Sequence, residues 1–280
     1  MFSKALFIGI DKYNSKNKKI KNLEGCVSDM YLMKETVTDV FGSLPKDTLV
    51  LTNHRATTQN ILDSLEHLVE ELKPGEQVFM YYAGHGGQVP NVSRNEEDTE
   101  AYDQILVPHD FSKTEPLLDD ILQTYFNRVP EGAKFIMILD SCHAGGMARA
   151  LMFSMLIDGI QRKGWTSRSI GRISRTEYSP IELQKLGEYK QRYMIEKSKS
   201  HFILLAAAQP HELAWERFFG KEKHGVFTYH LHEILKEKKA SLTPVNLINY
   251  AYSKIKTYRK NQMPRLIGNE ALFNKPLFKI

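Results

Sequence analysis

The sequence predicts an α/β fold, in which helices cover both faces of a six-stranded, mostly parallel sheet. Two features of the hydrophobic pattern indicate it. Short apolar runs, each bounded by turn or polar residues, recur along the chain, as the buried strands of a parallel sheet do. Between them lie longer segments whose apolar residues are three and four positions apart, which is typical of amphipathic helices. Alternating strands and helices require crossover connections, and these place helices on both faces of the sheet.

The individual elements follow from this pattern in chain order. The expected strands are Ala5–Ile10, Thr48–Thr52, Gln77–Ala83, Lys134–Asp140, His201–Ala208 and Pro264–Ile267. The expected helices are Gly25–Phe41, Thr57–Leu72, Leu117–Phe126, Val226–Lys236 and Thr243–Tyr258. At 280 residues the chain is long enough for one large domain or two small ones, and we expect a sizeable core.

The composition is that of a soluble globular protein, with 42% hydrophobic and 25% charged residues. No apolar run approaches the roughly 20 residues that a membrane span needs. The apolar stretch near the N-terminus is too short and too soon followed by charge to be a signal peptide. We therefore expect a cytoplasmic protein with no membrane partner. The net charge of +5 comes without a basic patch interleaved with aromatic residues, which argues against nucleic acid as a partner.

Two of the expected strands run directly into unusual small-residue turns. The stretch FMYYAGHGGQ, Phe79 to Gln88, places His85 among three glycines. The stretch FIMILDSCHAGG, Phe135 to Gly146, ends in a similar turn that carries Cys142. In open α/β sheets, ligands bind beyond the carboxyl ends of the strands, which is where both turns lie. If the two strands are neighbours in the sheet, His85 and Cys142 face each other.

This pairing predicts a catalytic dyad. A cysteine attacks as the thiolate, and a neighbouring histidine lowers its pKa and later protonates the leaving group. The backbone amides of Gly86 and Cys142 can donate to the developing oxyanion, and a backbone carbonyl is enough to orient His85. Taken singly, Cys142 could equally be a small buried hydrophobe and His85 a turn residue. Two turns of the same design at the same end of one sheet favour catalysis.

These residues resemble the caspase-like fold of cysteine peptidases, and in particular the metacaspases and their bacterial relatives. His85 in YYAGHGG stands 57 positions before Cys142 in LDSCHAGG, close to the roughly 50 positions of caspases. The triplet Asp-Ser-Cys is the metacaspase form, where animal caspases carry Gln-Ala-Cys. The GIDKYN opening and the segments LEGCVSDMYLM, AAAQPHELAWE and GVFTYHL are also similar to the family. The resemblance implies a single domain over residues 1–280, a three-layer α-β-α sandwich. Its parts would be a large-subunit-like part (1–146), a basic intersubunit-type loop (147–200) and a small-subunit-like part (201–280).

The resemblance also implies a substrate class. Metacaspases cleave after Arg or Lys because their S1 pocket holds carboxylates, and those positions match Asp29 and Asp140 here. Cys26 and Ala83 match further positions of the pocket wall. An Asp in a narrow cleft favours a cationic side chain through a charge-assisted hydrogen bond. Alternatively, Asp29 only complements the dipole of its helix and Asp140 only braces the turn, and neither alternative excludes the pocket role.

A calcium site is a further implication of the resemblance. Oxygen ligands from acidic side chains suit Ca²⁺, and the family's Asp-Asp pair matches Asp119 and Asp120. Acidic residues also gather in RNEEDTEAYDQ, Arg94 to Gln104, where the alternative is a solvated acidic loop. A third family ligand falls on or near Arg149, and an arginine there argues against the site. We expect that no cofactor is required.

The basic loop is a candidate for self-cleavage, because its sequence has no sustained hydrophobic period and predicts an exposed segment. Exposed segments are where proteolysis concentrates. The candidate cleavage sites are Arg162, Lys163, Arg168, Arg172 and Arg175. The alternative is an uncut surface loop, or one that caps the active site until a partner moves it.

The function that follows is a cysteine endopeptidase, a hydrolase acting on protein or peptide substrates. The resemblance further implies an activating or signalling partner and a role in bacterial defence or cell death. The alternative is a catalytically silent or partner-gated adaptor with the caspase fold, against which the intact Cys142 and His85 argue.

Overall fold

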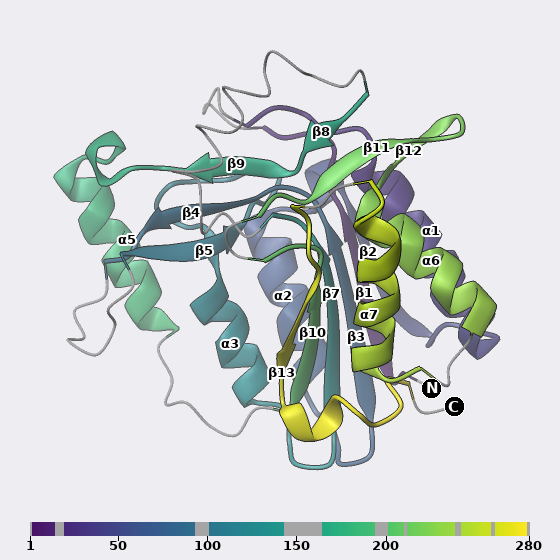
Figure 1. Ribbon diagram of the computed structural model, residues 1–280. Helices are drawn as coiled ribbons and strands as arrows, with labels where there is room; N and C mark the ends of the chain where they lie inside the picture. Colours follow the sequence, from purple (N-terminus) through teal and green to yellow (C-terminus); the bar gives the residue numbers. More distant parts are fainter. Residues whose placement is uncertain are drawn as a thin grey trace.

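The computed structural model describes residues 2–14, 20–92, 101–142, 164–193, 201–209, 212–238, 242–258 and 261–278. At its centre lies a six-stranded sheet, shown in Figure 1, with the strand order β13-β10-β7-β3-β1-β2. Its strands are β1 (Lys4–Gly9), β2 (Asp47–Thr52), β3 (Gln77–Ala83), β7 (Lys134–Asp140), β10 (Phe202–Ala206) and β13 (Arg265–Gly268). Every neighbouring pair is parallel except β10 and β13. The predicted six-stranded, mostly parallel sheet is confirmed.

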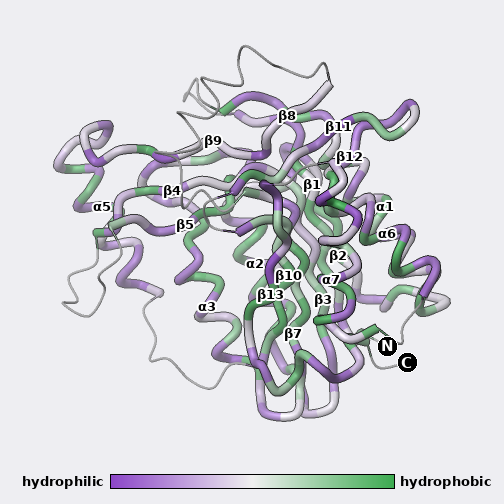
Figure 2. Tube along the Cα trace, in the orientation of Figure 1, coloured by the Kyte–Doolittle hydropathy of each residue, from purple (hydrophilic) through white to green (hydrophobic). Residues whose placement is uncertain are grey.

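Helices cover both faces of this sheet, as the alternating pattern predicts (Figure 1). Helices α1 (Cys26–Phe41), α6 (Val226–Lys238) and α7 (Pro244–Ile255) pack on one face together with Ala5 and Phe7. Helices α2 (Thr58–Val69) and α3 (Asp119–Asn127) pack on the other face, where Leu6 and Ile8 point. Successive strand residues thus alternate between two apolar cores, and in Figure 2 the central strands are mainly hydrophobic while the outer helices carry both kinds of residue.

Local signals place the helix ends within a few residues of the predictions. The Thr57 hydroxyl accepts a hydrogen bond from the Asn60 amide and begins α2, and Thr243 begins α7 in the same way. Helix α1 ends at Gly42, whose φ of 76° lies in the left-handed region that glycine adopts without strain. Helix α3 begins two residues after the predicted Leu117, because Leu117–Leu118 forms the short strand β6. Helices α2 and α7 each end three residues before the predicted Leu72 and Tyr258.

Two smaller sheets lie across one end of the central sheet (Figure 1). The first contains β6, β5 (Tyr102–Leu106), β4 (Gly86–Pro90) and β9 (Ser169–Arg172), and the second contains β12 (Glu222–Gly225), β11 (Trp215–Phe219) and β8 (Thr166–Ser167). Short 3-10 turns occupy Asn53–Arg55, Arg175–Glu177 and Glu270–Leu272.

The basic segment departs from its prediction as an exposed loop. Its described part, 164–193, forms β8, β9 and helix α5 (Pro180–Arg192), which begins with a capping box between Ser179 and Glu182. Leu186 and Tyr189 of α5 are buried in the same core as α2 and α3. Strands β8 and β9 pair with β11 and β4, which are distant in sequence. The local hydrophobic pattern therefore does not predict them. Among the described residues, no helix is long and apolar enough to cross a membrane.

Candidate active site

His85 and Cys142 lie at the same end of two neighbouring strands. Strands β3 and β7 pair in parallel with Ala83 opposite Asp140, so the two turns that follow them leave the sheet side by side. Both functional side chains are buried, with 2% of His85 and 1% of Cys142 exposed. The structure therefore places side by side the two turns that the sequence pattern pairs.

The imidazole of His85 is oriented by a backbone carbonyl. Its Nε2 lies 2.7 Å from the Lys21 carbonyl oxygen, and its backbone amide donates to the Tyr13 hydroxyl at 2.8 Å. The ring's Nδ1 is buried without a hydrogen-bond partner among the described residues. Burial lowers the pKa of His85 to about 4, although the backbone groups of Lys21 and Arg168 oppose the shift. At neutral pH the ring is uncharged and can accept a proton.

The thiol of Cys142 is held by the backbone of the neighbouring small-subunit-like part. The Ala214 amide donates to Sγ at 2.9 Å, and Sγ lies 3.4 Å from the Ala214 carbonyl oxygen. Burial raises the pKa of Cys142 to about 12, against the opposing hydrogen bonds from the Ala214 backbone and the Ser167 side chain. In this state the thiol is protonated and is not yet a nucleophile.

The amides of Gly86 and Cys142 converge on one carbonyl oxygen, that of Arg168. The donor–acceptor distances are 3.1 Å from Gly86 and 3.4 Å from Cys142. A Cβ added at Gly86 would collide with the Cys142 carbonyl oxygen, so this close approach requires glycine. Two backbone donors that share one acceptor beside a cysteine have the geometry of an oxyanion hole.

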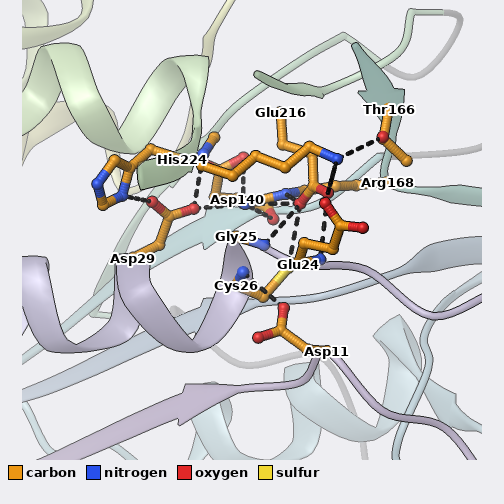
Figure 3. Close-up of polar contacts among 12 residues, drawn as sticks. Asp11, Glu24, Gly25, Cys26, Asp29, Asp140, Thr166, Arg168, Glu216 and His224 are labelled. Atoms are coloured by element: carbon orange, nitrogen blue, oxygen red, sulfur yellow. Dashed lines mark hydrogen bonds and ion pairs between the residues drawn. The ribbon is translucent and has the colours of Figure 1, made fainter. Parts of the chain in front are cut away.

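The side chain of Arg168 lies among three buried carboxylates, drawn in Figure 3. Its guanidinium binds Asp29, lies 3.1 Å from Asp140 Oδ1 and lies 3.3 Å from Glu216 Oε2. All four side chains are fully buried. The prediction of an exposed Arg168 is therefore wrong, because three carboxylates compensate the loss of hydration that normally keeps arginine at the surface.

Other groups hold the two pocket aspartates in place. Asp29 accepts hydrogen bonds from the Gly225 amide at 2.7 Å and pairs with His224 Nδ1 at 2.8 Å. Asp140 Oδ2 accepts from the backbone amide and the hydroxyl of Thr228, at 3.0 and 2.6 Å. Burial raises the pKa of Asp140 and the neighbouring Asp29 adds to the rise, while Arg168 opposes it. These carboxylates are built to receive a cation.

Glu216, which contacts Arg168 beside the two predicted aspartates, is a residue that the sequence reasoning missed. It ends the segment AAAQPHELAWE, whose resemblance to the family was the only available signal. Of the two wall residues in the prediction, Cys26 places Sγ 3.9 Å from Glu216 Oε2 and is fully buried. Ala83 is also fully buried and pairs with Asp140 across the sheet. Their roles as pocket wall stay predictions.

The chain before Arg168 pairs with the sheet as an added strand. Thr166 and Ser167, which form β8, lie antiparallel to β11, with Ser167 opposite Trp215 and Thr166 opposite Glu216. The Arg168 amide donates to the Ala214 carbonyl oxygen at 3.0 Å. Strand addition of this kind is a common mode of peptide recognition, in which backbone bonds supply affinity and side-chain pockets supply specificity.

The remaining candidate cleavage residues lie elsewhere. Arg172 donates to the Gln88 side chain at 3.1 Å and stacks over Tyr102, and Arg175 is exposed in a 3-10 turn. Arg162 and Lys163 lie outside the described residues.

The predicted calcium ligands sit beside an internal cation. Asp119 and Asp120 begin α3, and the ammonium of Lys190 from α5 lies 2.7 Å from Asp120 and 2.8 Å from the buried Asp103. Within the described ranges, no group of three or more acidic, His or Cys side chains is arranged to hold a metal ion. The Lys190 ammonium between Asp103 and Asp120 does not fit a calcium ion at the same position. The calcium site at Asp119 and Asp120 stays a prediction.

The sequence is similar to those of known metacaspases. A family model described as the metacaspase, peptidase C14 domain matches residues 3–150. Metacaspase-7 of Arabidopsis thaliana is 34% identical over 152 residues, which are 52% of this chain and 36% of the relative. Metacaspase-1 of Schizosaccharomyces pombe is 32% identical over 167 residues, 57% of this chain and 38% of the relative. The matched region thus spans less than two fifths of these relatives' length.

Solved structures resemble the fold over nearly the whole chain. Protein GSU0716 from Geobacter sulfurreducens has a TM-score of 0.73 at 18% identity, covering 100% of this chain and 99% of that one. Caspase-1 from Spodoptera frugiperda has a TM-score of 0.54 at 13% identity, covering 95% and 85%. At these identities the likeness is one of fold.

Proposed function

Because the chain belongs to the metacaspase family of C14 peptidases, we propose that it is a cysteine endopeptidase that cleaves protein or peptide substrates after Arg or Lys. Cys142 is the nucleophile and His85 the general acid and base. The amides of Gly86 and Cys142 form the oxyanion hole, and Asp29, Asp140 and Glu216 select the P1 side chain.

The observation that carries this proposal is the position of Arg168. Its carbonyl oxygen accepts from both proposed oxyanion donors, and its guanidinium lies among the pocket carboxylates. These contacts support the proposal that Arg168 is a P1 residue and that the Arg168–Ser169 bond is the scissile bond. The guanidinium Nε and Nη2 face Glu216, while Nη1 faces Asp140. The carboxylates thus contact three different nitrogens of the planar guanidinium group. We expect Arg to be preferred over Lys, whose ammonium is a single point of charge.

The reaction follows from these groups. His85 takes the proton of the Cys142 thiol, and the thiolate attacks the carbonyl carbon of the P1 residue. The oxyanion that forms is stabilised by the two backbone amides. As the peptide C–N bond breaks, His85 gives its proton to the leaving amine, and water then hydrolyses the thioester to release the new carboxyl end and the free thiol.

Self-processing is part of the proposal, and the Arg168–Ser169 bond is its site. The described arrangement corresponds to a resting state, because the ion pairs of Arg168 with Asp29, Asp140 and Glu216 hold the chain's own segment in the pocket against other substrates. Cleavage there would divide the chain into residues 1–168 and 169–280. Among the candidate sites in the described residues, Arg168 alone contacts the pocket carboxylates.

Intact-mass measurement tests both parts. Wild-type protein incubated over a range of pH and calcium concentrations should yield two fragments that meet at Arg168–Ser169. Cys142→Ala should stay intact under every condition, and Arg172→Gln, a matched change four residues further on, should be cut like the wild type. A cut elsewhere in the wild type, with Arg168–Ser169 left intact, would refute the assignment of the bond.

A second candidate, a catalytically silent or partner-gated adaptor, is favoured by one feature, the filled pocket. Fluorogenic peptides with Arg or Lys at P1 distinguish the two. Turnover that Cys142→Ala abolishes supports the peptidase, whereas no turnover across pH, calcium and added partner proteins supports the adaptor.

We also propose a role in bacterial defence or cell death, testable by comparing phage infection of cells that carry the wild type or Cys142→Ala.

A further inference from the structure

The segment that precedes Arg168 defines where a substrate's other residues bind. With Arg168 as P1, Ser167 is P2, Thr166 is P3 and Trp165 is P4. The backbone pairing with β11 fixes this register, because Thr166 lies opposite Glu216 and Ser167 opposite Trp215. Each side chain of the segment therefore marks one subsite of the enzyme.

At the P3 position, the Thr166 hydroxyl meets a buried cation. The ammonium of Lys223, on the neighbouring strand β12, donates to Thr166 Oγ1 at 2.9 Å. Only 9% of the Lys223 side chain is exposed, so little water competes for this hydrogen bond. Figure 3 shows Thr166 beside Glu24 and Glu216, the carboxylates that surround the same ammonium. Nitrogen–oxygen distances of 2.9 Å to Glu24 and 3.4 Å to Glu216 hold Lys223 in position.

The charges around Lys223 decide which side chain it accepts. Glu24 and Glu216 already compensate the charge of the Lys223 ammonium, so an acidic side chain of the substrate would bring a third negative charge. A neutral oxygen of the substrate instead accepts the remaining hydrogen bond of the ammonium without adding charge. An apolar side chain of the same size would leave one buried N–H without an acceptor, and this costs more than a hydrogen bond contributes.

We propose that Lys223 forms the S3 subsite of this enzyme and selects a neutral hydrogen-bond acceptor, such as the threonine hydroxyl, at P3. This inference rests on the proposed function and adds to it a specificity-determining residue on β12, outside the S1 pocket. Lys223 touches the substrate without taking part in the chemistry, so it acts on the choice of substrate and not on the reactivity of Cys142.

The test compares two fluorogenic peptides, Trp-Thr-Ser-Arg and Trp-Val-Ser-Arg, which differ by a hydroxyl in place of a methyl group. For the wild type, kcat/KM should favour the threonine peptide by about 10- to 150-fold, the range of a hydrogen bond to a charged group. Lys223→Met should bring this ratio close to one. Lys221→Met, in the exposed turn between β11 and β12, is the matched control and should keep the wild-type ratio.

The ratio is measured within each enzyme, so a partly unfolded variant does not distort it. A second measurement needs no change at Lys223: Thr166→Val in the full chain should slow self-cleavage by a similar factor, and Thr176→Val, at an exposed position, should not. A wild-type ratio near one, or a ratio that survives Lys223→Met, would overturn the S3 assignment while leaving the peptidase intact. Absence of turnover on both peptides would overturn the proposed function and this inference with it.

Discussion

The substitution Arg168→Gln distinguishes two interpretations of this residue. Either Arg168 is a bound substrate side chain, or it is a permanent part of a buried ion-pair cluster. Its guanidinium meets three fully buried carboxylates. If they stay buried, removing their cation should cost about 3–5 kcal/mol, the range for breaking a buried ion pair. At about 2–4 °C per kcal/mol in a domain of this size, the melting temperature would fall by about 6–20 °C. If the segment around Arg168 is a bound substrate, the substitution releases it and water hydrates the carboxylates. The fall in melting temperature then stays below that range.

The more direct readout is access to Cys142. The apparent affinity for a substrate falls in proportion to the fraction of molecules whose site is open. Even about 1.4 kcal/mol in favour of the bound segment would close about nine sites in ten. Arg168→Gln should therefore speed alkylation of Cys142 by an arginyl chloromethyl ketone by about tenfold or more, as followed by mass spectrometry of uncut protein.

Arg172→Gln is the control, since Arg172 lies in the same segment and contacts Gln88 and Tyr102 instead of the pocket. It should label like the wild type. A fall of melting temperature in the full range above, with unchanged alkylation, would show that Arg168 is a permanent part of the core and would refute the substrate interpretation.

Three further predictions concern the dyad, the oxyanion hole and the internal cation. Gly86→Ala places a Cβ against the Cys142 carbonyl oxygen and should lower kcat by about 100-fold or more; Gly187→Ala, whose added Cβ has its nearest neighbour 3.7 Å away, should keep wild-type activity, and equal rates would contradict the assignment. Because burial lowers the pKa of His85 from 6.5 to about 4, the unfolded chain binds a proton in that window that the folded chain does not. The free energy of unfolding should therefore decline as the pH falls from about 6.5 to about 4. Urea unfolding at several pH values should show a smaller decline for His85→Gln than for the wild type. Lys190→Met should destabilise the fold by about 2 kcal/mol, less than a fully buried pair because one of its two carboxylates is half exposed. Added calcium should raise the melting temperature of Lys190→Met but not of the wild type, and no response in the variant would argue against calcium at these acids.

The sequence by itself determined the sheet, its covering helices and the position of the two turns that carry His85 and Cys142. Strands β3 and β7 begin and end at the predicted residues, because fully buried parallel strands appear in the sequence as continuous apolar runs. The placement of the His85 and Cys142 turns side by side followed from topology alone, since parallel neighbours deliver their carboxyl ends to one edge of a sheet. The residues of the proposed dyad and oxyanion hole are thus local features, because each directly follows a strand that the sequence predicts.

Only the tertiary structure decided what fills the pocket. Nothing in the local sequence of Arg168 distinguishes it from Arg172 or Arg175, and basic residues in a segment without hydrophobic period ordinarily face water. Its burial depends on carboxylates from α1, β7 and β11, which are far apart in the chain. Hydrophobic periodicity reports how one element meets the core, whereas the compensation of a buried charge depends on which distant elements converge around it, and that convergence exists only in the folded chain.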